Sequence, residues 1–176
     1  VQQRGETSYA AMLASRPPVS EQLVIAEAIE LSRALGTRLH ILHLADGGGV
    51  EPVRRAQADG LPVTAETCPH YLALTDQDAA ALGAMIKGYP PVRTQRDQDL
   101  LWDGLRRGIL SHVASDHAPH SPEEKQKSLW EAPAGMAAIE TMPMVVLDAA
   151  NKGKLSICDV ARVLSEQPAK LFGTYP

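Results

Sequence analysis

The chain has 176 residues, of which 44% are hydrophobic and 22% are charged, and its formal net charge is −4. This composition indicates a soluble globular protein with one core, and its scattered basic residues do not favour a nucleic-acid partner. No apolar run approaches the ~20 residues that cross a bilayer, so a membrane partner is not expected either. The two cysteines stand far apart, which argues against a disulfide framework or a cysteine zinc site and favours a cytoplasmic setting.

The chain begins with a polar segment, residues 1–18, which ends in Arg16-Pro17-Pro18 and is predicted to be irregular. Apolar residues at helical spacing then predict a helix over 20–35, with Gly36 at its C-terminal end. The short apolar run 38–44 lies before a cluster of glycines, which is typical of a buried strand.

The same signals predict the later elements. Helices are expected over 50–58, 75–82, 96–107, 136–150 and 156–165, and strands over 63–68 and 109–115. Alternating strands and helices of these lengths are typical of βαβ units and therefore of a parallel sheet. Both an open doubly wound sheet and part of a (β/α)₈ barrel remain possible from periodicity alone.

Several ionisable residues fall where these strands end, namely His43, Glu66, His70, Asp116, His117 and His120. The carboxyl ends of parallel strands open on one face, where α/β proteins build their sites. Histidine and aspartate are ligands for a borderline cation such as zinc, and a carboxylate beside a metal-bound water can also carry a proton. The pattern therefore predicts a metal site assembled from several strand ends.

A second interpretation is open for each of these residues. His43 on its own can be a packed core histidine, and His40 and His112 lie within strands and are taken as structural. Asp116 at the end of an apolar run needs a cation, a hydrogen-bond cluster or a helix N-terminus to offset its desolvation.

For Glu66, the alternative is an edge carboxylate paired with Lys87 or Arg93. From residue types alone, a metal hydrolase and an α/β domain of unspecified function are therefore equally favoured.

Four stretches, taken together, resemble the cyclic amidohydrolases, the group that includes dihydroorotase, allantoinase and hydantoinase/dihydropyrimidinase. They are RLHILHLAD (38–46), VTAETCPHYLALT (63–75), GYPPVRTQRDQDLLWDGLRRG (88–108) and VASDHAPHSPEEK (113–125). The resemblance implies an α/β fold, a partial (β/α)₈ TIM-like barrel covering roughly strands six to eight with the C-terminal helices. Residues 1–176 would then be the C-terminal part of the barrel domain, without the first strands and their metal-binding HxH pair.

Residue by residue, the resemblance implies that His43 ligates a metal at the sixth barrel strand. Asp116, at the eighth, would contact the other metal and act as the catalytic proton shuttle. His120 corresponds to a residue that holds the substrate, and the backbone of Ala134 and Gly135 to a substrate-contacting loop.

The same resemblance implies roles for three further residues. His117 and His70 are expected to support the ligands and the loop rather than bind metal. Tyr89 stands where dihydroorotases commonly place an Asn that contacts the substrate ring, so it is a candidate substrate contact.

The activity that the resemblance implies is metal-dependent hydrolysis of a small cyclic amide or imide by the full-length protein.

 This hydrolysis would use a divalent metal, most simply zinc, with two ions per complete site. The full-length protein is expected to form a homo-oligomer. The 176-residue chain alone is expected to be inactive, because three strands cannot close a barrel. A catalytically inactive scaffold or assembly partner of the same fold is the alternative.

Overall fold

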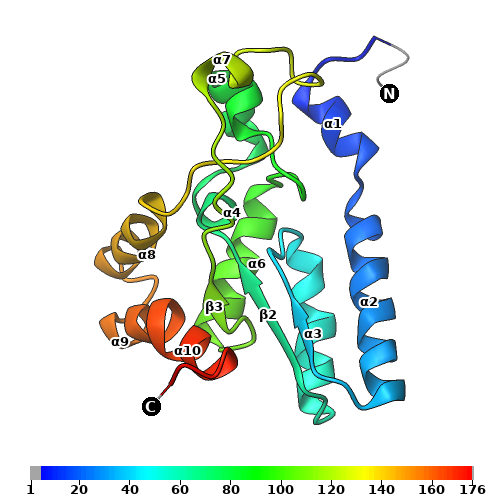
Figure 1. The fold of residues 1–176 in the computed structure, drawn as a ribbon, viewed down its shortest axis with the longest axis vertical. Coiled ribbons are helices and arrows are strands. Elements are labelled where there is room, and N and C mark those ends of the chain that lie inside the picture. The colour runs from blue at the N-terminus through cyan, green and yellow to red at the C-terminus, as the bar shows by residue number, and fades with distance from the viewer. Residues whose placement is uncertain (1–4, 176) are drawn as a thin grey trace.

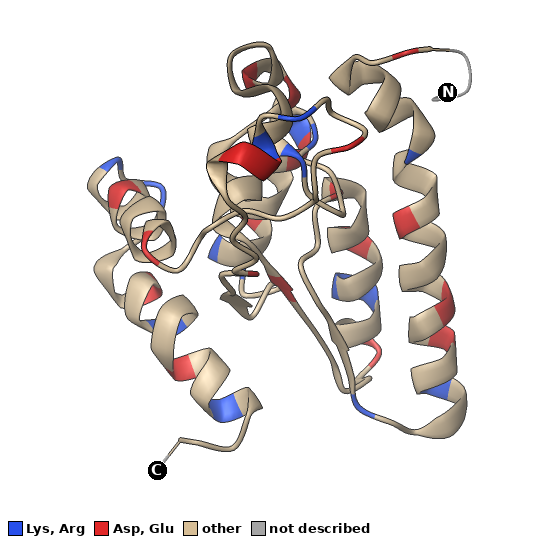
Figure 2. Ribbon diagram, turned by 45° about the horizontal axis from the view of Figure 1, so that its top comes forward, with Lys and Arg blue, Asp and Glu red and all other residues tan. Residues whose placement is uncertain are grey.

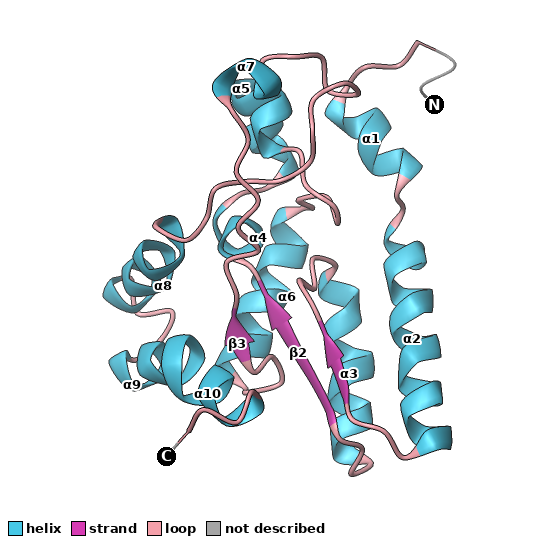
Figure 3. Ribbon diagram, viewed as in Figure 1, coloured by secondary structure: helices cyan, strands magenta, loops and turns pink. Residues whose placement is uncertain are grey.

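The computed structural model describes residues 5–175, and its centre is a small parallel sheet (Figure 1). The strands are β1 (Leu39–Ile41), β2 (Val63–Thr67) and β3 (His112–Val113), in the order β1-β2-β3. Leu39 lies opposite Val63, and Glu66 lies opposite His112. All three arrows point toward the end of the molecule that carries α1, α5 and α7 (Figure 3). The expected parallel arrangement of strands is therefore confirmed.

Three long helices pack around this sheet: α2 (Pro18–Leu35), α3 (Val50–Ala58) and α6 (Gln95–Arg106). α3 contacts β2 and α2 contacts β1. Their apolar residues meet those of the strands in one core, in which Val53, Ala65 and Leu101 are fully buried. α3 connects β1 to β2, and α6 lies between β2 and β3, as the βαβ pattern predicts.

The other helices follow the strand ends or form the C-terminal region. They are α4 (Pro69–Ala73), α5 (Ala79–Leu82), α7 (Pro122–Lys125), α8 (Thr141–Asn151), α9 (Ile157–Ala161) and α10 (Gln167–Leu171). Among the described residues, the 3₁₀ turn η2 (Gly47–Gly49) precedes α3, the 3₁₀ turns η3 (Asp76–Asp78) and η4 (Gly83–Ile86) flank α5, and a π-helical turn, η5 (Arg162–Glu166), joins α9 to α10. Within residues 5–175, no helix has both the length and the hydropathy to cross a bilayer.

Basic and acidic residues alternate along the helices (Figure 2), and this holds for the two pairs of adjacent arginines in the chain, Arg54-Arg55 and Arg106-Arg107. Glu51 pairs with Arg54 and Arg55 on α3, and Asp103 pairs with Arg106 and Arg107 on α6. These pairs are three or four residues apart, the spacing at which side chains on a helix meet. Both arginine pairs are therefore part of mixed-charge helix surfaces.

The expectation that residues 1–18 are irregular is wrong for residues 9–15, because α1 (Tyr9–Ser15) is a helix, while residues 1–4 lie outside the described residues. The Ser8 hydroxyl accepts a hydrogen bond from the N–H of Ala11 at 3.1 Å and caps the helix. Met12 is fully buried, so the segment belongs to the packed structure. The prolines that suggested a loop instead stand at the start of α2, where a missing N–H does no harm.

The outer strands are shorter than predicted. β1 ends at Ile41 and β3 has two residues, and beyond each strand the backbone contact with β2 continues as single hydrogen bonds, from the N–H of Leu44 to the Glu66 carbonyl and from the N–H of Ala114 to the Thr67 carbonyl. At the C-terminal end, α8 begins five residues later than the expected 136. The helical segment that was expected to stop at 165 continues through η5 and α10 to Leu171.

Candidate active site at the strand ends

His43 and Asp116 follow the carboxyl ends of β1 and β3 and have an unusual backbone. Their φ angles are 39° and 45°, and within residues 5–175 they are the only residues other than glycine with positive φ. This left-handed region is sparsely populated by residues with a Cβ atom, and such outliers concentrate at functional sites. The two residues that the sequence singles out as metal ligands are thus also the two with strained backbone.

The end of β2 contributes Cys68 and His70 to the same region. A ligand atom from each lies within 4.8 Å of the other and of a carboxylate oxygen of Asp116. Cys68 and His70 are buried, whereas Asp116 is exposed. Cys68 is not predicted as a metal ligand from the sequence, because no second cysteine stands at metal-binding spacing. Its position at the end of a predicted strand is the signal that could have identified it.

The histidines of this region have buried nitrogen atoms without a hydrogen-bond partner among the described residues. They are both ring nitrogens of His70 and Nδ1 of His43. Burial, and to a lesser extent the neighbouring His43, lowers the pKa of His70 to about 4, although Asp116 opposes the shift. A neutral imidazole is the form that binds a metal, and a buried unpaired polar atom is explained by an ion or a water. These residues therefore fit a divalent cation.

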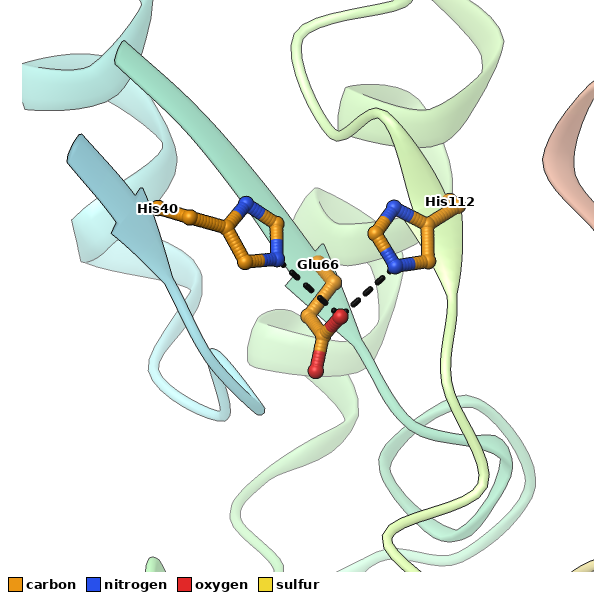
Figure 4. A group of neighbouring side chains, drawn as sticks. All are labelled: His40, Glu66 and His112. Carbon is orange, nitrogen blue, oxygen red and sulfur yellow. Dashed lines mark hydrogen bonds and ion pairs between the residues drawn. The ribbon is translucent and has the colours of Figure 1, made fainter. Parts of the chain in front are cut away.

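A second histidine cluster lies within the sheet and consists of His40, Glu66 and His112 (Figure 4). The Nε2 atoms of His40 and His112 lie 3.1 and 2.7 Å from the same oxygen, Oε2 of Glu66. Their Nδ1 atoms lie 2.7 Å from the hydroxyl of Thr64 and 2.8 Å from that of Ser111. Every ring nitrogen of this cluster has a protein partner.

The expected pairing of Glu66 with Lys87 or Arg93 is therefore wrong. Glu66 lies opposite His112 in the sheet, and this register brings the two side chains to one face. Arg93 instead pairs with Glu21 at 3.1 Å, and Lys87 donates to backbone carbonyls.

The cluster within the sheet and the histidines at the strand ends differ in whether the protein satisfies their hydrogen bonds. Burial alone would raise the pKa of Glu66, but hydrogen bonds from His112 and His40 hold it at about 2. The cluster is thus a complete hydrogen-bonded network around a carboxylate. The nitrogens of His43 and His70 have no such partners among the described residues, so these histidines are the better candidates for metal ligation.

The residues expected to contact substrate fall into two places. Nε2 of His120 lies 3.0 Å from the carbonyl oxygen of Ala134, and the N–H of Gly135 donates to the carbonyl of Lys87 at 3.0 Å. His120 and Gly135 line a cavity of about 400 Å³ together with His70. This cavity joins the predicted substrate loop to the end of β2.

Tyr89 lies elsewhere, beside a cavity of about 540 Å³ that is also lined by His43. The guanidinium carbon of Arg16 lies 3.8 Å from the centre of the Tyr89 ring. Tyr89 thus lines the same cavity as the candidate ligand His43, whereas His120 and Gly135 line the other one.

His117 holds the loop that follows β3. Its Nδ1 atom accepts hydrogen bonds from the N–H groups of Ala138 and Ile139 at 3.0 and 3.2 Å. His117 and Met136 also form an isolated β-bridge. These contacts fix residues 136–139 outside helical geometry, which accounts for the late start of α8.

Sequence comparison finds relatives along nearly the whole chain, although no family model matches it. The chain is 39% identical to an L-hydantoinase of Paenarthrobacter aurescens over 176 residues, 98% of this chain and 38% of that protein. It is 39% identical to a dihydroorotase of Latilactobacillus sakei over 89% of this chain and 37% of the relative. An allantoinase of Enterococcus faecalis is 38% identical over 97% of this chain and 38% of the relative.

Comparison of the fold with solved structures also finds a hydantoinase. The structure of the L-hydantoinase from Arthrobacter aurescens superposes with a TM-score of 0.94 at 38% identity, covering 99% of this chain and 40% of that one. The chain thus spans about two fifths of the length of the relatives that it matches. Together, the matching sequence, the matching fold and the strand-end residues show that this chain belongs to the cyclic amidohydrolase family.

Proposed function

We propose that this chain is part of a longer, metal-dependent hydrolase that opens a cyclic amide or imide at a C–N bond. The observation that carries the proposal is a buried His70 ring with no partner among the described residues, one nitrogen of which lies within 4.8 Å of a carboxylate oxygen of Asp116. The buried Nδ1 of His43, at the end of the neighbouring strand, likewise has no partner among the described residues. Relatives named hydantoinase, dihydroorotase and allantoinase support the reaction class.

In this proposal, residues 1–176 are the C-terminal part of a (β/α)₈ barrel domain, and β1, β2 and β3 are its sixth, seventh and eighth strands. The parallel order of the strands and the TM-score of 0.94 over 40% of a hydantoinase chain support this placement. A barrel builds its site from the loops after all its strands. The preceding strands would supply the remaining metal ligands, including the HxH pair.

His43 and Asp116 would hold the metals, with His70 beside them. Two divalent ions, most simply zinc, supply a water of lowered pKa and polarise the ring carbonyl when bound. Asp116 takes the proton from the attacking water as the new C–O bond forms at the ring carbonyl carbon. It then gives that proton to the ring nitrogen as the C–N bond breaks, so one water is added across the bond.

The remaining predicted site residues would bind and orient the substrate. His120, through its bond to the Ala134 carbonyl, would fix the loop of Ala134 and Gly135 against the ring. Tyr89 would border the opposite side of the site, next to His43. His117 would keep this loop in place. We expect the whole protein to be a cytoplasmic homo-oligomer that acts on a small molecule.

The test uses the whole protein that contains this chain, purified without added chelator. We expect about two metal ions per subunit by elemental analysis and turnover of at least one of dihydroorotate, allantoin, hydantoin and dihydrouracil. Removing the metal should abolish turnover, and adding zinc back should restore it. A protein that holds no metal and turns over none of these rings would refute the proposal and favour a scaffold role.

A further inference from the structure

We propose that Lys87 and Lys125 act as a pair of buried cations that clamp the segment 130–135 and thereby position it for the substrate. The inference rests on the proposed function, because that function gives the segment its substrate. Neither lysine belongs to the candidate metal site. Lys87 is 3% exposed and Lys125 is 5% exposed, although lysine side chains are almost never fully buried unless they are paired.

Lys125 uses all the hydrogen-bonding capacity of its ammonium group on backbone oxygens. Its Nζ atom donates to the carbonyls of Gly135 at 2.9 Å, Pro133 at 3.1 Å and Lys87 at 3.4 Å. An ammonium has three donors and no acceptor. All three point at main chain, so the group serves to hold backbone in place.

Lys87 holds the other half of the same segment. Its Nζ atom donates to the carbonyls of Trp130, at 3.1 Å, and Ala132. Its own carbonyl accepts both from the ammonium of Lys125 and from the N–H of Gly135, at 3.0 Å. The two lysines are thereby joined through one backbone oxygen, and four carbonyls between 130 and 135 point at an ammonium.

The pair is unusual because no carboxylate within residues 5–175 forms an ion pair with either lysine. Among the described residues, each ammonium is hydrogen-bonded to carbonyl oxygens alone. A buried charge needs full hydrogen-bonding to offset its desolvation. The carbonyls of the segment must therefore converge as they do, and the conformation of the segment depends on both cations.

The clamped segment ends at the candidate site. Gly135 has a φ of 135° and is so close to its neighbours that an added Cβ would lie 2.6 Å from the carbonyl oxygen of Ala118. Gly135, Lys125 and His120 line the cavity of about 400 Å³ that also contains His70. A shift of the segment would therefore change the shape of this cavity while leaving His43 and Asp116 in place.

The test replaces each lysine in the whole metal-loaded protein by Met, which keeps the length of the side chain and removes the charge. We expect Lys87→Met and Lys125→Met to raise the KM for the cyclic amide about tenfold and to leave kcat within about threefold, since binding and not bond breaking is affected. Lys127→Met, an exposed neighbour, is the control and should leave KM unchanged.

Two further measurements separate positioning from general loss of structure. Hydrogen exchange at residues 130–136 should be faster in both Met variants, and metal content should equal that of the unsubstituted protein. Lys125→Gln retains two N–H donors for the carbonyls, so it should fold even where Met does not and should give an intermediate KM.

The outcomes are distinct. If the unsubstituted protein hydrolyses no cyclic amide, the proposed function fails and this inference fails with it. If the unsubstituted protein is active, and the Lys87 and Lys125 variants keep its KM and its exchange rates in the segment, the clamp alone is refuted. A fall in kcat with unchanged KM, in proportion to lost metal, would also refute it.

Discussion

His43 and Asp116 share a left-handed backbone, with φ of 39° and 45°, at the carboxyl ends of β1 and β3. The two strands flank β2 on opposite sides, so the two strained residues stand on either side of its end. Neither position has the glycine that would adopt this conformation freely. The Cβ atoms at both positions therefore cost stability, and backbone outliers of this kind concentrate at functional sites.

This strain can be measured by comparing Asp116→Gly with Asp116→Ala. Both variants lose the carboxylate, and both should be inactive. Because a left-handed residue with a Cβ atom costs roughly 1–2 kcal/mol, Asp116→Gly should be about 1 kcal/mol more stable than Asp116→Ala. Urea unfolding of the metal-free proteins measures the difference, and equal stability of the two variants would show that the position is unstrained.

Asp116→Asn tests the proton transfer. The amide has nearly the same shape but cannot accept the proton, so we expect turnover to fall by about 10²–10⁴-fold, the usual contribution of a general base. Much of the metal should remain, because other ligands hold it. Asp103→Asn, at a half-buried acid on α6 outside the candidate site, is the control. Turnover by Asp116→Asn close to that of the control would remove Asp116 from the mechanism.

The pKa of Glu66 predicts how acid affects the sheet. The pKa is about 2 in the folded protein and near 4.5 when unfolded. A carboxyl group with a lowered folded pKa adds stability that is complete above about pH 4.5 and is lost as the pH falls toward 2. We expect this to amount to about 1–3 kcal/mol.

Urea unfolding of the metal-free protein between pH 6 and pH 3 measures the effect of Glu66. Glu66→Gln has no proton to gain, so its stability should change less over this range than that of the unsubstituted protein. Parallel pH dependences of the two proteins would mean that Glu66 is not held ionised by its histidines.

Gly135→Ala tests the close packing of the substrate loop. The new methyl group would lie 2.6 Å from the Ala118 carbonyl oxygen, and φ is 135°. We expect a loss of about 2 kcal/mol or more in unfolding free energy, together with weaker substrate binding. Gly60→Ala is the matched control, since Gly60 also has positive φ but open space around it, and it should cost only about 1 kcal/mol. Equal effects of the two substitutions would contradict the close approach.

The sequence predicted helices best where the signals were local. The helix over 50–58 was predicted to the residue, because Val50, Val53 and Ala56 form one apolar face and Asp59-Gly60 ends it. The α1 helix was missed because two prolines were taken for a loop signal. The lengths of β1 and β3 depend on which strands lie beside them, and periodicity does not carry that information.

The candidate site was also predictable only where its signals were local. His43 and Asp116 stand at strand ends, a position that local patterns reveal, and the structure places both there. The partners of Glu66 were not predictable, since they depend on the register between strands far apart in sequence. The contacts of Lys87 and Lys125 were not predictable either, because both lysines bind backbone carbonyls, which every residue type has.

The His40–Glu66–His112 network has a consequence for how the sheet is assembled. Each of its members comes from a different strand: Glu66 lies opposite His112, and His40 lies opposite Thr64, two residues before Glu66 and so on the same face of β2. A shift of β1 by one residue would turn His40 to the other face and put a leucine or isoleucine beside a buried carboxylate. The carboxylate thus penalises misaligned pairing across all three strands at once, so this polar layer selects the correct alignment as much as it stabilises it.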